Sequence, residues 1–210
     1  MKFLLTLLLF SPLICFTQNT IEKQLDSIST PEDATKFLKT HKSEEGKLYI
    51  FNKEKHKTRL AKELFKLSKG RKKVYKTDFK KTYYKIINKA EVDYYKFNII
   101  MLDGNKTSNH SAKVIRDKVL SQYNEGYQFK DLAKHHSSGP TANMGGDTGW
   151  IKLGDISDAF DEHAFIENRT INDVFTIDDI ENQKYYIVMK TKDKTPIEEI
   201  TVIKLTEDLK

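Results

Sequence analysis

The stretch from Phe129 to Phe165 constrains the fold of this 210-residue chain more than any other part of the sequence; it reads FKDLAKHHSSGPTANMGGDTGWIKLGDISDAFDEHAF. It begins with an amphipathic segment that predicts a short helix, and a polar loop follows. A glycine-rich turn, a tryptophan and a second turn come next, and the stretch ends in another short segment with apolar residues on one face. The pattern predicts two short helices separated by tight turns.

The residues on both sides of this stretch predict strands and one longer helix. Tyr95–Leu102 alternates with a period of two and is rich in β-forming residues, which is typical of a strand. Ser111–Tyr123 has apolar residues at helical spacing, whereas Ile171–Ile177 and Tyr185–Thr191 are strand candidates. Ile200–Leu205 predicts a terminal strand or an extended tail. This order predicts the α+β class.

The part of the chain before Tyr94 contains several helix signals. Thr30 is a good N-terminal cap, and Pro31 suits the first turn of a helix. Lys55–Ser68 predicts a second helix, with Gly70 as its C-terminal cap. The short segment 47–51 (KLYIF) is typical of either a strand or a turn of helix.

A third N-terminal helix is predicted after a basic linker. Asp78 is placed to cap it, and its apolar stripe would consist of Phe79, Tyr83, Ile86 and Ile87. We therefore expect a small helical region over residues 18–91.

The first seventeen residues predict a secretory signal peptide. Lys2 is followed by an apolar run that is too short to span a membrane, and we place cleavage after Thr17. Cys15 is the only cysteine, but Ile14 stands where a lipoprotein signal needs a small residue, so we do not expect a lipid anchor. After cleavage, the mature protein would be periplasmic or secreted, without stable insertion in the membrane and without a thiol for nucleophilic or redox chemistry. The alternative is that the segment is not cleaved and anchors the protein.

The net charge of +6 comes from lysines that are spread along the chain. A solvated surface is the simpler interpretation, and attraction to acidic surfaces or acidic unfolded chains is the alternative. The mixture of lysine and tyrosine at 71–96 suggests a nucleic-acid surface, but its apolar residues fit a core and we expect no nucleic-acid partner. His135 and His136 are adjacent and would point apart on a helix, so we expect no metal site.

The chain has a distinctive spacing of residues from Gly126 onward: Gly126, Phe129, Leu132, Ala133, Ser137, Gly145, Gly146, Asp147, Gly149, Trp150, Gly154, Ile156, Phe160, Phe165 and the strand Tyr185–Met189. This spacing resembles that of a parvulin-type (PpiC, or rotamase) peptidyl-prolyl isomerase domain. The resemblance implies an antiparallel sheet of about four strands with helices packed around it. It places the domain at 92–193, after the helical region 18–91 and before a tail or extra strand at 194–210.

The resemblance also implies where an X–Pro bond would bind. The positions that match the family's proline pocket are Ile156 and Phe160, with Trp150 nearby and Thr148 where a leucine is usual. Ordinary core packing is the alternative role for Ile156 and Phe160. No cofactor or metal is implied.

The positions that match the family's polar catalytic centre are all substituted. Asn98 and Tyr186 stand where two histidines are usual, and Gly139 stands in place of a cysteine or aspartate. Gln183 aligns near a position that often holds serine or threonine. Asn98 and Tyr186 both form hydrogen bonds, so they can act as a neutral pair beneath the pocket.

Two functions fit these residues. The first is a prolyl isomerase that assists the folding of exported proteins, with unfolded or extended proline-containing polypeptides as its partners. The second is a parvulin-fold chaperone that binds such segments without catalysis. A weaker third idea assigns client binding to the helices at 18–90. A phosphate-directed isomerase is not expected, because Asp103–His110 offers only Lys106 as a basic residue.

Overall fold

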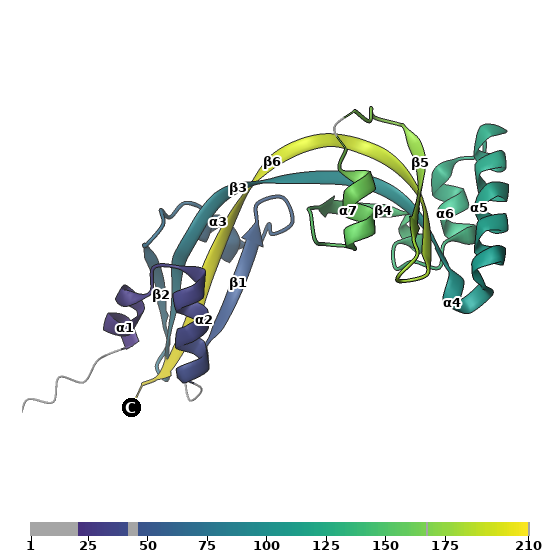
Figure 1. Cartoon of the computed structure of the whole chain (residues 1–210). Coiled ribbons are helices and arrows are strands. Elements are labelled where there is room, and N and C mark those ends of the chain that lie inside the picture. The colour runs from purple at the N-terminus through teal and green to yellow at the C-terminus, as the bar shows by residue number, and fades with distance from the viewer. Residues whose placement is uncertain (1–20, 42–45, 167, 210) are drawn as a thin grey trace, which may run out of the picture. The chain divides into compact units, whose positions relative to one another are not determined.

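The computed structural model describes residues 21–41, 46–166 and 168–209. Within these ranges the chain forms seven α-helices, one 3-10 helix and six β-strands (Figure 1). The predicted α+β class is confirmed, and helices precede the parvulin-like part of the chain. The predicted signal peptide, its cleavage site and Cys15 lie outside the described residues.

All six strands belong to one sheet, and each pairing with a described register is antiparallel. The strands are β1 (Lys47–Asn52), β2 (Lys72–Lys76), β3 (Lys80–Asp103), β4 (Asp147–Ile151), β5 (Val174–Asp179) and β6 (Lys184–Asp208). The order is β1-β6-β3-β2, with β4 paired to β3 and β5 paired to β6. The four strands β3 to β6 correspond to the number expected for the parvulin-like part.

The chain divides into two compact units. Unit 1 contains the described parts of Met1–Tyr49, Leu67–Asn88 and Val202–Lys210, and unit 2 contains Ile50–Lys66 and Lys89–Thr201. The long strands β3 and β6 contribute residues to both units. The boundaries expected from the sequence remain a prediction.

In unit 2 the sheet has an apolar core on each face, because the side chains of a strand alternate between the two faces. One core contains Ile100 and Leu102 of β3 with residues of helices α5 (Asn109–Asn124) and α6 (Phe129–His136). The other contains Phe97 and Ile99 of β3 with residues of α7 (Asp158–Ala164). The remaining helices of unit 2 are α3 (Arg59–Phe65), α4 (Gly104–Thr107) and the 3-10 helix Ala142–Met144.

The glycine-rich turn leads directly into β4, a strand that the sequence did not predict. Gly146 has φ +84°, and a Cβ added there would lie 2.5 Å from the carbonyl oxygen of Ile99. The Ile99 amide donates to the Gly146 carbonyl at 2.9 Å. Only glycine combines this backbone conformation with so close an approach to β3.

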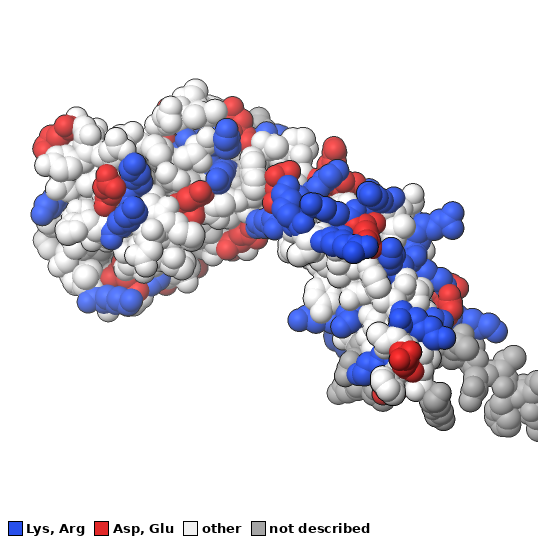
Figure 2. All heavy atoms as spheres, turned by 180° about the vertical axis from the view of Figure 1, so that it is seen from behind, with Lys and Arg blue, Asp and Glu red and all other residues white. Residues whose placement is uncertain are grey.

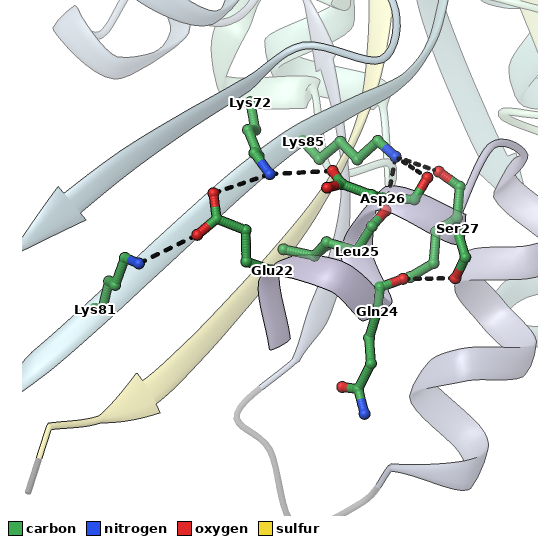
Figure 3. A network of polar contacts seen from close by, with 9 residues as sticks. Glu22, Gln24, Leu25, Asp26, Ser27, Lys72, Lys81 and Lys85 are labelled. Atoms are coloured by element: carbon green, nitrogen blue, oxygen red, sulfur yellow. Dashed lines mark hydrogen bonds and ion pairs between the residues drawn. The ribbon is translucent and has the colours of Figure 1, made fainter. Parts of the chain in front are cut away.

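In unit 1 the helices α1 (Ile21–Ser27) and α2 (Pro31–Thr40) pack on one face of the strands. Thr30 and Asp33 form a capping box at the start of α2, as the predicted cap requires. Lys85 Nζ donates to the carbonyl oxygens of Leu25 at 2.6 Å and of Ile28 at 2.7 Å, which attaches the end of α1 to β3 (Figure 3). Burial lowers the pKa of Lys85.

Helix α1 also forms ion pairs with the strands. Lys72 of β2 lies 3.0 Å from both Glu22 and Asp26, and Lys81 of β3 lies 3.4 Å from Glu22 (Figure 3). Because these pairs are partly exposed, each contributes little, and the buried apolar residues account for most of the packing.

The helix predicted after Asp78 is wrong, since this segment is the start of β3. Its aromatic and β-branched residues favour a strand, and β2 supplies the antiparallel partner, with Val74 opposite Tyr83. Phe79 lies at the turn of this hairpin and is 77% exposed. A helical stripe and a strand buried on both faces both contain closely spaced apolar residues, so the spacing alone did not distinguish them.

Three other local predictions have clear outcomes. The segment 47–51 is a strand. The helix after Lys55 ends at Phe65, so Gly70 is not its cap but lies in the turn before β2, with φ +83°. The strand predicted at 185–191 and the strand or tail at 200–205 are parts of one strand, β6.

Candidate active site

The short helix α7 places Phe160 against the sheet. Ser157 caps this helix, because its hydroxyl accepts from the Phe160 amide at 3.3 Å. Phe160 and Ala164 lie one turn apart and both belong to the core cluster with Phe97 and Tyr186. The apolar cluster is therefore built from α7 and the four strands β3, β4, β5 and β6.

Aromatic rings surround Phe160 within this cluster. The centroid of its ring lies 5.9 Å from that of Phe97 and 5.6 Å from that of Tyr186, both in edge-to-face geometry. Phe160 has no solvent exposure, whereas Ile156 and Met101 are partly buried and pack against the same cluster. Phe160 thus forms the floor of this region, and Ile156 and Met101 are among the partly exposed side chains around it.

Tyr186 carries a hydroxyl group into this apolar cluster. Burial, with the nearby charges of Asp179 and Asp103, raises its pKa to about 12. Asp103 is itself held in the charged form, because a hydrogen bond from Lys184, 2.6 Å away, lowers its pKa. The Tyr186 phenol is therefore neutral at physiological pH, so it can act there as a hydrogen-bonding group but not as a base.

Asn98 does not share a sheet face with Tyr186. Phe97 and Ile99, its neighbours along β3, belong to the cluster of Tyr186 and Phe160. Because side chains alternate along a strand, Asn98 lies on the face of Ile100, opposite Asp147 of β4 in the register. The structure thus does not bring the two residues at the histidine positions together on one face.

The loop that contains Gly139 is attached to β3 at Met101. The hydroxyl of Ser137 accepts from the amides of Met101 at 3.0 Å and of Gly139 at 3.2 Å, and the Ser138 amide donates to the Met101 carbonyl at 2.8 Å. A Cβ on Gly139 would lie 3.2 Å from Met101 Cβ. Gly139 is therefore close to one apolar wall of the region, and there is little room for a side chain.

Thr148 connects β4 to β3 where the register shifts between Lys96 and Asn98. Its hydroxyl accepts from the Phe97 amide at 3.1 Å and donates to the Phe97 carbonyl at 3.0 Å. The side chain thus replaces the backbone pairing that the bulge removes. Thr148 accordingly fixes β4 against β3 at the bulge. Its part in substrate binding remains a prediction.

Trp150 is partly buried in β4 and lies opposite Lys96 in the register. Of the residues predicted from the sequence, the structure groups Ile156, Phe160 and Tyr186 in one cluster. Trp150 and Thr148 lie on the strand that precedes α7. Gln183 has φ +52° in the turn between β5 and β6.

The sequence prediction missed Phe97 and Met101. Both lie on the same face of β3 as Ile99, because the three are alternate residues of the strand. Phe97 belongs to the cluster around Phe160, and Met101 packs against it. The period of two in β3 was the signal that distinguishes them from Asn98.

A pocket of about 170 Å³ lies beside Ala164, at the end of α7. It is lined by Tyr95, Ala164, Ile166, Lys190, Asp193 and Lys194. Tyr95 and Ala164 belong to or pack against the cluster around Phe160, but none of the residues predicted to bind substrate lines the pocket.

The described residues hold no group of three or more His, Cys, Asp or Glu side chains that is placed to bind a metal ion. His136 instead contacts the Gln122 side chain at 3.1 Å, and burial lowers its pKa. In the same part of the chain, no helix combines the length and the apolar character that crossing a membrane requires.

Comparison with known families identifies the class of protein. Residues 81–195 match the PPIC-type PPIASE domain, and these residues make up more than half of the 210-residue chain. The chain therefore belongs to the PpiC-type family of peptidyl-prolyl isomerase domains, as the resemblance predicted.

Solved structures of the same class are similar to this chain over about half of its length. A PpiC-type peptidyl-prolyl cis-trans isomerase domain has 22% identity and a TM-score of 0.44, and covers 50% of this chain and 93% of its own. PrsA from Bacillus subtilis has 25% identity and a TM-score of 0.39, over 49% of this chain. The peptidyl-prolyl isomerase ESS1 from Candida albicans has 21% identity and a TM-score of 0.42, over 47% of this chain and 63% of its own.

The match to PrsA covers only 36% of the length of that protein. No curated protein matches the chain.

Proposed function

We propose that this chain is an exported prolyl isomerase that assists the folding of other exported polypeptides. Its single strongest support is the apolar cluster of α7, in which the partly buried Ile156 lies beside the floor formed by Phe160, in a chain of the PpiC-type family. The proposed substrates are unfolded or extended segments that contain proline.

The chemistry needs an apolar site rather than a nucleophile or cofactor. Rotation about a peptide bond has a barrier of about 18–20 kcal/mol, because the planar form is stabilised by resonance. A site that removes the X–Pro bond from water and holds the proline ring can favour the twisted state over both planar states. We assign Ile156 and Met101 to the grip on the ring, with Phe160 and Tyr186 beneath it.

Trp150 and Thr148 complete the proposed substrate-binding region along β4. Asn98, Tyr186 and Gly139 remain the positions proposed for the polar centre. Of these, Tyr186 is the one that carries a polar group into the cluster around Phe160, as a neutral phenol. We therefore expect modest catalysis that depends more on the apolar walls than on polar groups.

A second candidate is a chaperone on a parvulin frame that binds without catalysis. Its support is that Gly139 offers no side chain, and that Asn98 and Tyr186 lie on opposite faces of β3 and β6. Such a protein would hold the same polypeptide segments but leave the isomerisation rate unchanged.

The experiment that separates the two is isomerisation of uncharged X–Pro tetrapeptides by the full chain. Ile156→Ala is the test variant, and Leu153→Ala is its control, because Leu153 lies in the same connection between β4 and α7 but is 63% exposed. We expect acceleration by the wild-type chain, a loss of about tenfold in kcat/KM for Ile156→Ala, and little change for Leu153→Ala.

Phe160→Ala is unsuitable as the main test, because removing a fully buried phenylalanine costs roughly 3–5 kcal/mol of stability. Absence of acceleration by the folded wild-type chain, with binding of an unfolded polypeptide that Ile156→Ala weakens, would establish the chaperone instead.

Export and localisation belong to the same proposal. The sequence of residues 1–17 supports a signal peptide and a periplasmic or secreted mature protein. The proposed domain division is a region at 18–91, the isomerase domain at 92–193 and a C-terminal segment at 194–210. Amino-terminal sequencing of the secreted protein tests the cleavage after Thr17.

A further inference from the structure

The excess positive charge of the protein belongs to unit 1. The described residues of unit 1 include thirteen Lys and Arg but seven Asp and Glu, a net charge of +6. Those of unit 2 include twenty of each kind, a net charge of zero. On the face that Figure 2 shows, Lys and Arg outnumber Asp and Glu in the part of the molecule that contains unit 1. The excess charge and the candidate active site thus belong to different units.

One face of the unit 1 strands is not covered by the helices α1 and α2. These helices pack against Tyr83, Ile87, Ile203 and Leu205, which define one face of β3 and β6. By alternation, the side chains between them lie on the opposite face, which we call the tyrosine face. Its residues are Lys47 and Tyr49 of β1, Lys204 and Thr206 of β6, Thr82 and Tyr84 of β3, and Lys73 and Tyr75 of β2.

Contacts between these residues confirm that they share a face. The hydroxyls of Thr82 and Thr206 are 3.2 Å apart, which joins β3 to β6. The rings of Tyr75 and Tyr84 are 5.9 Å apart and nearly perpendicular, which joins β2 to β3. The tyrosine face is therefore continuous across neighbouring strands of the sheet.

The acidic residues of unit 1 lie away from this face. Four of the seven belong to α1 and α2 on the other side of the strands. Glu207 accepts from the Tyr83 hydroxyl at 2.7 Å, and Tyr83 belongs to the helix-covered face. Asp208 pairs with Lys80 at 3.7 Å near the end of β6. The seventh, Asp78, lies in the turn between β2 and β3. The strands of the tyrosine face thus present ammonium and hydroxyl groups, and the acidic residues lie on the other face or at the ends of the strands.

We propose that the tyrosine face binds acidic segments of extended polypeptides, and so holds a client chain while its prolines are processed in unit 2. This inference rests on the proposed function for its biological role. Carboxylates would pair with Lys47, Lys73 and Lys204 and accept hydrogen bonds from the tyrosine hydroxyls.

The ring geometry favours a polypeptide over a single-stranded nucleic acid. Bases bind such surfaces by stacking on open aromatic faces. Here Lys73 Nζ lies 5.5 Å from the centre of the Tyr75 ring, and Lys47 Nζ lies 5.3 Å from the centre of the Tyr49 ring. The lysines therefore occupy ring faces that bases would need, whereas a carboxylate can bind the same lysines from the solvent side.

The test measures the binding of a fluorescent, unstructured peptide rich in Asp and Glu and free of proline, by anisotropy with the full chain. The variant Lys47→Gln/Lys73→Gln/Lys204→Gln removes three charges from the tyrosine face. The control Lys23→Gln/Lys36→Gln/Lys39→Gln removes three charges from exposed positions on α1 and α2. We expect binding to weaken roughly tenfold in the first variant and by less than about twofold in the control.

Three further measurements make the result decisive. A peptide with Lys in place of each Asp and Glu should not bind. Both triple variants should isomerise an uncharged tetrapeptide at the same rate, and this activity also shows that the variants fold. If both triple variants bind the acidic peptide equally weakly, the binding site does not lie on the tyrosine face. Displacement of the acidic peptide by an oligonucleotide that binds more tightly would overturn the polypeptide assignment.

The two proposals fail separately. If the wild-type chain binds the acidic peptide through the three lysines but isomerises no tetrapeptide, the tyrosine face stands and the isomerase proposal falls. If isomerisation is present and the acidic peptide does not bind, the tyrosine face has no such role.

Discussion

Tyr186 brings a phenol into the apolar cluster of the candidate active site. It stands where the resemblance implies a histidine, yet its pKa of about 12 keeps it neutral over the whole physiological range. A histidine there would change its charge near neutral pH, whereas this tyrosine would not. Any catalysis by this chain should therefore show no ionisation of this group between pH 5 and 8.

The raised pKa of Tyr186 also predicts how stability depends on pH. The unfolded chain would ionise this tyrosine near pH 10, while the folded chain retains the proton up to about pH 12. The folded state then binds more protons in this window, so its stability falls as the pH rises from about 10 to about 12. We expect this group to lower the free energy of unfolding by roughly 2–3 kcal/mol across the window, a contribution that Tyr186→Phe lacks.

Urea unfolding of both proteins at the two ends of this window measures the effect. Tyr127→Phe, at a position 57% exposed, is the matched control for removing one hydroxyl. The same pH dependence in wild-type and Tyr186→Phe proteins would mean that other groups carry it, such as the tyrosines at 83, 84 and 94, whose pKa values are also raised by burial.

The elements around the site depend on backbone contacts at β3 and β4. Thr148 supplies side-chain hydrogen bonds at the bulge, and Ser137 does the same for the loop of Gly139. Each of these hydroxyls satisfies backbone groups of β3 that would otherwise lack a partner, which costs about 1–3 kcal/mol when such groups are buried. The polar loop and the glycine turn are thus fixed to one strand.

The glycine turn allows a matched comparison between two positions. Gly146→Ala forces a Cβ to within 2.5 Å of the Ile99 carbonyl oxygen, whereas Gly149 also has a positive φ but no neighbouring atom within 4 Å of such a Cβ. We expect Gly149→Ala to cost about 1 kcal/mol and Gly146→Ala at least about 3 kcal/mol. Chemical denaturation, followed by the fluorescence of the single tryptophan, measures both.

Equal losses in the two variants would contradict the steric argument. They would show that the positive φ alone determines the cost of the Cβ, and that β3 and the turn can move apart.

At the scale of the whole molecule, the net positive charge belongs to unit 1 and the candidate active site belongs to unit 2. The described residues of unit 2 are neutral in total, whereas those of unit 1 carry +6. We therefore expect kcat/KM for an uncharged tetrapeptide to change by less than about twofold between roughly 0.05 M and 0.5 M salt, because a substrate without net charge makes no charge–charge attraction that salt could screen.

Binding of the acidic peptide should weaken by about tenfold over the same range, since salt screens exposed ion pairs. Parallel titrations of the two activities at each salt concentration check this. A peptide affinity that is insensitive to salt would contradict the charge-based account of the tyrosine face.

Much of the fold followed from local patterns in the sequence. The helices α5, α6 and α7, the cap at Thr30 and the strand after Tyr94 were predictable because each has a signal within a few residues. The spacing of the glycines and of Phe160 was specific enough to predict the family. These features depend on short-range sterics, capping and periodicity, which a single segment contains in full.

Tertiary structure decided the features that depend on a distant partner. The segment after Asp78 became a strand because β2 pairs with it, and the bulge opposite Thr148 set the register of β4. The orientation of Asn98 away from Tyr186 follows from which face of β3 meets α7. Unit 1 itself, with its excess charge and its tyrosine face, consists of three segments far apart in the sequence, so only the folded chain brings those lysines and tyrosines onto one surface.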